Sequence, residues 1–320
     1  MLMLYKNISL VFLTLFISLK LLSQNNSFNF IAFGDMPYNL PKDYKNFENV
    51  IKTINDQNSV FTINVGDIKP SVTPCSEESY HKMLNYYAQF NKPMIYVPGD
   101  NEWTDCSKQE AGSYDPEERL EVIRKLFFKD GKSLGNEKLK LTSQSQSKNF
   151  SKFVENNRWD YNGISFATIH IVGSNNNFLS TSKNGNKEFY EREAADLAWL
   201  DEVFKHAKEN NAKALILAIH ADMFFSYIDM KEASGFNQLK KRIKDLSIDF
   251  KKPVLLINGD SHVFLIDKPF YADDKTKKSL VNFTRLQVQG DYNIHAVKIT
   301  VDPNSLSVFR FEELIVEGNQ

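Results

Sequence analysis

Short apolar runs alternate with amphipathic segments along the first third of the chain. Runs rich in β-forming residues span 28–33, 60–65 and 94–97, and each stops at or just before a glycine. Between them, segments 44–57 and 77–90 carry apolar residues at helical spacing. This order of strand, helix, strand, helix, strand predicts parallel strands joined by right-handed crossovers.

The rest of the chain continues this pattern and ends in strands. A helix is expected to begin after Asp115, with Pro116 in its first turn, and the Asn162-Gly163 step is a strong hairpin signal. The other predicted helices are 187–210 and 236–246. The other predicted strands are 153–157, 164–172, 214–219, 254–257, 263–266, 280–288, 294–301 and 306–311. No repeat, linker or low-complexity tract interrupts the pattern, so one α/β domain over 27–318 is the simplest interpretation.

Four of the predicted strands end in a Gly-Asp step. The aspartates of these steps are Asp35, Asp67, Asp100 and Asp260. In open α/β sheets, the C-terminal ends of the strands carry the ligand sites. His220 follows another apolar run, and His262 lies two residues beyond Asp260. We therefore expect these six side chains to converge on one spot.

Convergent carboxylates and imidazoles suit a cluster of divalent metal ions better than other common cofactors. Two divalent cations about 3.5 to 4 Å apart can activate a bridging hydroxide and clamp the oxygens of a phosphate ester during hydrolysis. A single Gly-Asp step is also a routine turn, so each step alone is weak evidence. The ordered series favours a metal-dependent hydrolase of small phosphorylated substrates.

Composition narrows the range of functions. The 320 residues are 42% hydrophobic and 25% charged, which is enough apolar material for a large core. A net charge of −1 gives no basic footprint for a nucleic-acid partner. The sequence does not specify an oligomeric state.

The first residues have the pattern of an export signal. Lys6 supplies a basic start, and 8–22 is mainly apolar. A stretch of about 15 residues is too short to cross a hydrocarbon core of roughly 30 Å. We expect a signal peptide over 1–24 and an exported, periplasmic or secreted protein without a stable membrane anchor. An uncleaved N-terminal anchor is the alternative.

The two cysteines of the chain fit an oxidising compartment. Cys75 and Cys106 each follow a Gly-Asp loop instead of lying in an apolar run. Two loops at the same sheet edge could bring the sulfurs within bonding range, and exported proteins form disulfides. We expect a disulfide between them, with two free thiols as the alternative.

In their order along the chain, these motifs resemble those of the calcineurin-like metallophosphoesterase family. The matching positions are Asp35, Asp67, Gly99-Asp100-Asn101-Glu102, His220 and Gly259-Asp260-Ser261-His262. The resemblance covers 28–311 and implies an α/β fold, a four-layer α/β/β/α sandwich of two mixed sheets. It also implies that the ligands lie on loops at one edge of the sheets.

The resemblance assigns each residue a role at two metal ions. Asp35, Asp67 and His262 would hold the first ion. Asp67 would bridge to the second ion, which Asp100, His220 and Asp260 would complete.

The chain departs from the family pattern at three places. The family's first motif is usually Asp-x-His, whereas here Asp35-Met36-Pro37 lacks the histidine. Asp100 stands at the position of an Asn ligand, and Asn101 stands at the position of the catalytic His. Asp260 replaces a His in the last motif. Carboxylate oxygens are harder ligands than imidazole, so among Mn, Fe, Mg and Zn the site is expected to favour Mn or Fe.

Asn101 cannot act as a general acid, so its expected role is contact with the substrate phosphate or with water. The candidate acids for the leaving group are Glu102 and His170, unless water supplies the proton. The sequence is compatible with a phosphomonoester or a phosphodiester substrate.

Two other interpretations remain. A fold that lacks the catalytic His could persist as an exported binding protein. The Gly259-Asp260-Ser261 sequence is also typical of a class of Ser-dependent esterases, although the position of this motif late in the chain does not fit that class.

Overall fold

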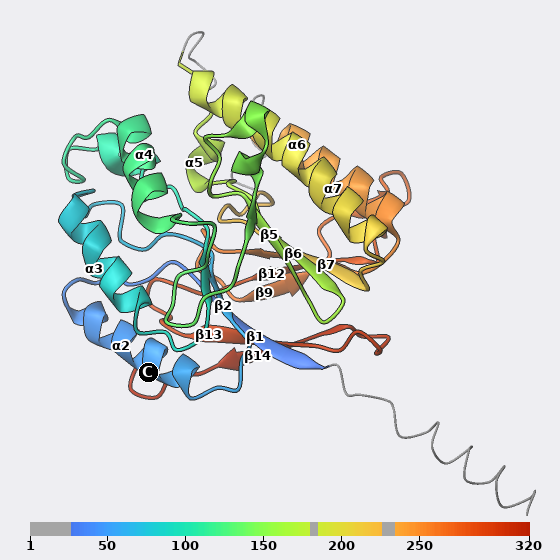
Figure 1. The fold of residues 1–320 in the computed structure, drawn as a ribbon, viewed down its shortest axis with the longest axis horizontal. Coiled ribbons are helices and arrows are strands. Elements are labelled where there is room, and N and C mark those ends of the chain that lie inside the picture. Colours follow the sequence, from blue (N-terminus) through green and yellow to red (C-terminus); the bar gives the residue numbers. More distant parts are fainter. Residues whose placement is uncertain (1–26, 180–184, 226–233) are drawn as a thin grey trace, which may run out of the picture.

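The computed structural model describes residues 27–179, 185–225 and 234–320. The predicted signal peptide lies outside the described residues. Within the described residues, no helix is both long and apolar enough to cross a membrane. Two β-sheets stack face to face, and helices cover the outer face of each sheet (Figure 1). The fold is therefore the four-layer α/β/β/α sandwich of two mixed sheets that the sequence predicts.

The first sheet has five strands in the order β14-β13-β1-β2-β3. The strands are β1 (Phe28–Phe33), β2 (Thr62–Asn64), β3 (Met94–Tyr96), β13 (Ala296–Val301) and β14 (Phe309–Leu314). β1, β2 and β3 are parallel, whereas β13 and β14 are antiparallel to their neighbours. The outer face of this sheet packs against α2 (Lys42–Asn55), α3 (Glu77–Tyr87) and α4 (Pro116–Phe127).

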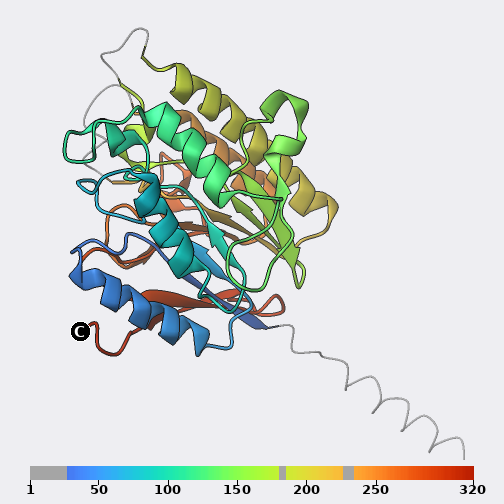
Figure 2. The same cartoon turned by 60° about the vertical axis from the view of Figure 1, so that its left-hand side comes forward.

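The second sheet has seven strands in the order β4-β5-β6-β7-β8-β12-β9. The strands are β4 (Thr142–Ser143), β5 (Asn157–Tyr161), β6 (Ile164–Thr168), β7 (Ala214–Ala218), β8 (Val254–Asn258), β12 (Phe283–Gln287) and β9 (Leu265–Asp267). The central strands β6, β7, β8 and β12 are parallel. Helices α6 (Lys187–Glu209) and α7 (Asn237–Phe250) cover the outer face (Figure 2).

The remaining elements are short. They are the 3-10 turns η1 (Thr104–Ser107), η2 (Gln144–Gln146) and η3 (Lys148–Phe150), the turn α5 (Gly173–Asn176), and the two-stranded ribbon of β10 (Tyr271–Asp273) and β11 (Lys278–Ser279).

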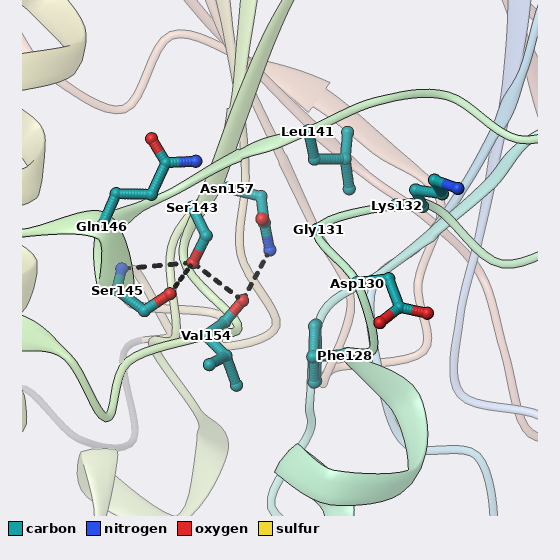
Figure 3. Close-up of a pocket in the computed structure, with 10 residues that line it drawn as sticks. All are labelled: Phe128, Asp130, Gly131, Lys132, Leu141, Ser143, Ser145, Gln146, Val154 and Asn157. Carbon is teal, nitrogen blue, oxygen red and sulfur yellow. Dashed lines mark hydrogen bonds between the residues drawn. The ribbon is translucent and has the colours of Figure 1, made fainter.

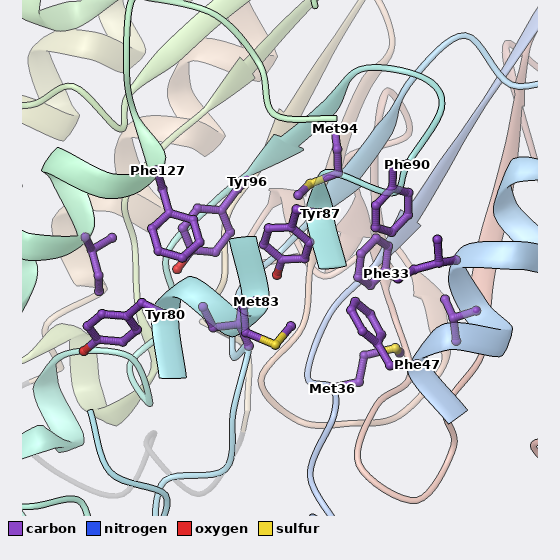
Figure 4. Close-up of a cluster of buried hydrophobic side chains, with 14 of the residues drawn as sticks. Phe33, Met36, Phe47, Tyr80, Met83, Tyr87, Phe90, Met94, Tyr96 and Phe127 are labelled. Carbon is purple, nitrogen blue, oxygen red and sulfur yellow. The ribbon is translucent and has the colours of Figure 1, made fainter. Parts of the chain in front are cut away.

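The strands are apolar on both faces because both faces are covered. In β1, Phe30 and Ala32 point into the layer between the sheets, whereas Ile31 and Phe33 point toward the helices. A strand that buries both faces reads as a continuous apolar run instead of an alternating one. The helix-covered side of the first sheet is rich in aromatic rings, and Phe33 stacks on Phe90 with centroids 5.7 Å apart (Figure 4).

The structure corrects the predicted hairpin. Its turn at Asn162-Gly163 is confirmed, but its first strand is β5 over Asn157–Tyr161 and not 153–157. Glu155 and Asn156 lie in the loop before β5, and both side chains are buried in polar contacts. Hydrogen bonding to neighbouring side chains therefore holds the 153–156 segment, and the strand begins later.

The predicted disulfide joins Cys75 and Cys106, with Cα atoms 5.7 Å apart. Both cysteines are fully buried. The bridge ties the loop after β2 to η1, and therefore links the loops that follow Asp67 and Asp100. Cys75 N also donates to Ala111 O at 2.9 Å, which strengthens the same connection.

Candidate metal centre

The loops that leave the parallel strands of both sheets meet at one edge of the sandwich. Asp35, Asp67 and Asp100 follow β1, β2 and β3, whereas His220 and Asp260 follow β7 and β8. Direct contacts join the two sheets at this edge. Asp260 N donates to Asp35 Oδ1 at 3.0 Å, and His220 Nδ1 lies 2.7 Å from Val65 O.

Two groups of side chains have the geometry to hold a metal ion. The first group is Asp35, Asp67 and His262, and the second is Asp67, Asp100 and His220. Within each group, one ligand atom from each residue lies within 4.8 Å of the others. Asp67 belongs to both groups, so its carboxylate lies between the two positions.

Asp260 lies beside the second group. Its Oδ1 is 3.9 Å from His220 Nε2, and its Oδ2 accepts from Asp222 N at 3.0 Å. About a quarter of the Asp260 side chain is exposed, whereas Asp35, Asp67 and Asp100 are buried. Asp260 and His262 therefore form the solvent side of the cluster.

The tautomer of His220 follows from its backbone contact. Val65 O can only accept, so the proton on that side is on His220 Nδ1. His220 Nε2 then faces Asp100 Oδ1 at 2.9 Å and Asp67 Oδ1 at 3.4 Å. A backbone carbonyl that fixes the tautomer and orients the other ring nitrogen is the arrangement of a metal-binding histidine.

The buried carboxylates of the cluster favour a bound positive charge. The pKa of Asp35 is raised to about 8, mainly by burial; His220 opposes the rise, and the neighbouring Asp260 and Asp100 carboxylates contribute to it. Burial, with Asp100 and Glu102, also holds the pKa of Asp67 well above its usual range. Within the described residues, the buried Asp35 Oδ2 accepts no hydrogen bond. An unpaired buried carboxylate oxygen among like charges fits a bound cation.

The backbone at the site is held in left-handed conformations. Asp35, Asp67 and Asp260 have φ values of 54°, 53° and 75°. Gly66 has φ 98°, and a Cβ there would lie 2.7 Å from Gly99 N and 2.8 Å from His220 Nδ1. Only glycine fits at this position, because it both turns the chain and lets the second sheet approach. Left-handed non-glycine residues concentrate at functional sites.

Asn101 does not point freely toward solvent. Its Nδ2 donates to Tyr38 Oη at 2.8 Å and to Lys69 O at 3.2 Å, and its backbone N donates to Asp67 Oδ1 at 3.1 Å. Tyr38 Oη in turn donates to Asp67 Oδ2 at 2.5 Å. Asn101 therefore orients Tyr38, and the half-exposed tyrosine lies nearer to solvent.

Tyr38 is a site residue that the sequence argument missed. It follows Asp35 by three positions, in the motif where the resembled family has its histidine. Its ring packs edge-on against His262 with centroids 5.2 Å apart. A tyrosine just past a Gly-Asp step was the signal that could have indicated it.

A fifth Gly-Asp step also reaches the site. Gly290-Asp291 follows β12, and Asp291 N donates to Asp35 O at 2.8 Å. The Asp291 carboxylate lies 3.9 Å from His262 Nδ1. This step is not among the four predicted site steps, although it has the same form.

Ser174 is the third residue that the sequence argument missed. Its Oγ donates to Asp100 Oδ2 at 2.7 Å. Residues 174–177 all have left-handed φ values between 50° and 58°. The buried Arg192 holds this turn, because it donates to Asn176 Oδ1 at 2.5 Å and to Asn176 O at 2.9 Å. The turn follows the end of β6, at the same edge as the other loops.

A comparison with known families shows to which family the chain belongs. The family model described as calcineurin-like phosphoesterase matches residues 28–264. The chain belongs to the calcineurin-like phosphoesterase family. None of the curated proteins matches its sequence.

Two solved phosphatases share the fold of this chain. One is the purple acid phosphatase PPD1 from yellow lupin (Lupinus luteus) seeds, with 16% identity and a TM-score of 0.53. The similarity covers 93% of this chain but only 53% of the lupin chain. The other is a dimetal phosphatase from Danio rerio, with 9% identity, a TM-score of 0.53, and coverage of 91% of this chain and 99% of that one. At these sequence identities, the similarity to the two phosphatases shows a shared fold.

Glu102 lies where its carboxylate stabilises the backbone and not where it could protonate a leaving group. The side chain is fully buried, and its Oε1 accepts from Asp67 N, Gly99 N and Tyr96 Oη at 2.8 to 3.0 Å. These bonds fix the backbone of the second and third Gly-Asp loops. A carboxylate that holds three donors inside the protein is not available to protonate a leaving group.

We expect Glu102→Gln to preserve activity and Glu102→Ala to unfold or strongly destabilise the protein. Glutamine keeps the accepting oxygen, whereas alanine leaves three buried donors unpaired, at about 1 to 3 kcal/mol each. Urea denaturation and hydrolysis kinetics of both variants test this. If Glu102 were the general acid, the glutamine variant would lose about a hundredfold or more in kcat while remaining folded.

His170, the other candidate acid, also lies in a buried position with internal partners. His170 is fully buried, and its Nδ1 lies 2.9 Å from Glu155 Oε1. Arg124 pairs with the same carboxylate, so His170 belongs to an internal ion-pair network. Burial lowers the pKa of His170, and Glu155 only partly opposes this effect. Its ring packs beside Trp103, with centroids 5.5 Å apart.

The contacts of Ser261 do not support the Ser-dependent esterase. Ser261 Oγ donates to Asp222 Oδ2 at 2.8 Å, and the buried Arg285 donates to the other oxygen of Asp222 at 2.7 Å. A serine nucleophile needs a base to accept its proton. Here the hydroxyl is bound to a carboxylate that an arginine already holds.

A separate pocket of about 400 Å³ lies between the end of α4 and strands β4 and β5 (Figure 3). It shares no residue with the two ligand groups. Two of its polar side chains are already bonded to the wall, since Ser143 Oγ and Asn157 Nδ2 both donate to Val154 O. We therefore place the chemistry at the aspartate and histidine cluster.

Proposed function

We propose that this protein hydrolyses phosphate esters with two divalent metal ions held at the edge of the sandwich. The observation that carries the proposal is the pair of ligand groups that share Asp67. Membership of the calcineurin-like phosphoesterase family supports the same reaction class. Mn or Fe would be favoured over Zn, because four carboxylates and only two imidazoles supply the ligands.

Each residue has a defined task in this proposal. Asp35 and His262 would hold one cation, and Asp100, His220 and Asp260 would hold the other, with Asp67 shared. When bound, the two cations would supply a nucleophile from water and absorb charge on the phosphoryl oxygens.

The groups that would touch the substrate are the hydroxyls on the solvent side. Ser174 is exposed and Tyr38 is half-exposed. Asn101 would orient Tyr38 through its amide. Because both candidate acids are buried, the leaving group would take its proton from water.

The decisive experiment is hydrolysis of p-nitrophenyl phosphate and bis(p-nitrophenyl) phosphate with and without Mn²⁺. We expect turnover with Mn²⁺, its loss on treatment with a chelator, and recovery when Mn²⁺ is restored. Ser261→Ala should retain catalysis, whereas a Ser-dependent esterase would lose it. Absence of turnover with Mn²⁺, Fe²⁺, Mg²⁺ and Zn²⁺ would favour the exported binding protein.

Export is a separate proposal. The buried Cys75–Cys106 disulfide suits an oxidising compartment, and the apolar start of the chain has the form of a signal peptide. Mass spectrometry of the protein from its native host should show a mature chain that begins near residue 25. A full-length chain would contradict cleavage.

A further inference from the structure

The charge of the metal centre distinguishes between the two classes of phosphate ester. Four carboxylates come together here: Asp35, Asp67 and Asp100 belong to the two ligand groups, and Asp260 Oδ1, the proposed fourth, lies 3.9 Å from His220 Nε2. They balance the charge of two divalent cations completely. The family motifs that this chain resembles supply only two carboxylates, because Asn and His stand where Asp100 and Asp260 do. Before the hydroxide nucleophile is counted, the filled centre of this chain would therefore be neutral, where two carboxylates would leave it positive.

Two further observations concern where these carboxylates lie. A Cβ at Gly173 would lie 2.4 Å from Asp100 Oδ1 and 2.7 Å from Asp260 Oδ1, so both oxygens face the same point. Asp291 adds another carboxylate next to His262, and about a quarter of its side chain is exposed.

The nearby cationic side chains bind other groups of the protein. Lys69 Nζ donates to the backbone oxygens of Pro70 and Thr73. Arg285 is shared between Asp222 and Asp267. Within the described part of the chain, the ion pairs of the four ligand aspartates all involve His220 or His262. The described residues therefore offer the substrate neutral hydroxyls and no arginine or lysine clamp.

Uncharged surface lies next to the cluster. The Tyr38 ring packs against His262, and Val263, the next residue along the chain, is 58% exposed. Tyr292, which follows Asp291, is 79% exposed. Such a rim can contact an ester substituent that a monoester lacks.

We propose that the site selects phosphodiesters, whose phosphate carries one negative charge, over phosphomonoesters, whose phosphate carries two. This inference rests on the proposed metal-dependent hydrolysis. A monoester is close to dianionic at neutral pH because its second pKa is about 6. A neutral centre to which the described residues add no cationic side chain compensates the second charge poorly, whereas the single charge of a diester needs less compensation.

The first test uses binding, so that it does not depend on turnover. Methyl phosphate and dimethyl phosphate differ by one methyl group and, at about pH 8, by one charge. Titration calorimetry of the full chain loaded with Mn²⁺ should show that dimethyl phosphate binds at least as tightly as methyl phosphate. Tighter binding of methyl phosphate would overturn the proposal.

The second test removes one charge at a time. Asp100→Asn and Asp260→Asn should each raise the affinity for methyl phosphate relative to dimethyl phosphate by about tenfold or more. The ratio of kcat/KM for p-nitrophenyl phosphate to that for bis(p-nitrophenyl) phosphate should rise in the same direction. Asp249→Asn is the matched control. Asp249 lies exposed on α7 and pairs with Lys208, so its replacement should leave both ratios unchanged.

The outcomes separate the two proposals. The metal content of every variant is measured first. If either Asp100→Asn or Asp260→Asn loses a cation, the variant that keeps both cations is used for the comparison. If Mn²⁺ binds but neither nitrophenyl ester is hydrolysed, the proposed function is wrong and the binding comparison still decides the charge preference. If both esters are hydrolysed but the variants leave the ratios unchanged, the proposed function stands and the diester preference is wrong.

Discussion

Replacing Asp67 with alanine should abolish both hydrolysis and the binding of at least one metal ion. Asp67 is the one residue common to both ligand groups. Its Oδ1 also accepts a hydrogen bond from Asn101 N, and its Oδ2 accepts one from Tyr38 Oη. Its removal takes a ligand from each cation and releases the tyrosine. Metal ions contribute several kcal/mol to transition-state stabilisation, so we expect kcat to fall by about a thousandfold or more.

The measurement is metal content by mass spectrometry together with kcat for a nitrophenyl ester. Asp201→Ala is a suitable control because Asp201 lies on the exposed surface of α6 and pairs with Arg242. A folded Asp67→Ala protein that keeps two metal ions and its activity would contradict the assignment of Asp67 as the shared ligand.

Removing the disulfide with Cys75→Ala and Cys106→Ala together should lower the free energy of unfolding by about 3 to 4 kcal/mol. The estimate follows from the loop-closure entropy of a bridge between positions 31 apart. The bridge also lies against the third motif, since both sulfurs are close to the Asn101 and Glu102 carbonyl oxygens. We therefore expect weaker metal binding as well as lower stability.

Urea denaturation of the double variant, with and without Mn²⁺, measures both effects. The double variant is the correct comparison because a single replacement leaves one buried free thiol. Wild-type protein denatured under reducing conditions should show the same loss. Equal stability of the oxidised protein and the double variant would mean that the bridge contributes nothing to the fold.

Much of the fold could be predicted from local patterns. Strands that bury both faces, such as β7 and β8, have continuous apolar runs that are visible in the sequence, and the Asp115 cap with Pro116 marks the start of α4 correctly. The hairpin strand was placed too early because Glu155 and Asn156 bond to partners on distant elements, and no local pattern records such bonds.

The candidate site divides in the same way. The Gly-Asp steps indicate which carboxylates lie at the strand ends, and the structure brings all four predicted ones to a single edge. The candidate acids Glu102 and His170 are chemically able to donate a proton, but tertiary packing buries both, which their sequence positions do not indicate. Tyr38, Ser174 and Asp291 were missed because their contacts to Asp67, Asp100 and His262 cross between loops far apart in sequence.

The sequence by itself determined the alternation of strands and helices and the presence of metal-binding side chains at the strand ends. Hydrophobic periodicity and the glycine turns encode these features within a few residues. Only the tertiary structure decided that Asp67 lies between two ligand groups and that Asp100 and Asp260 face one point. The reason is physical: these distances depend on how closely the two sheets approach, and glycines such as Gly66 set that approach across the interface.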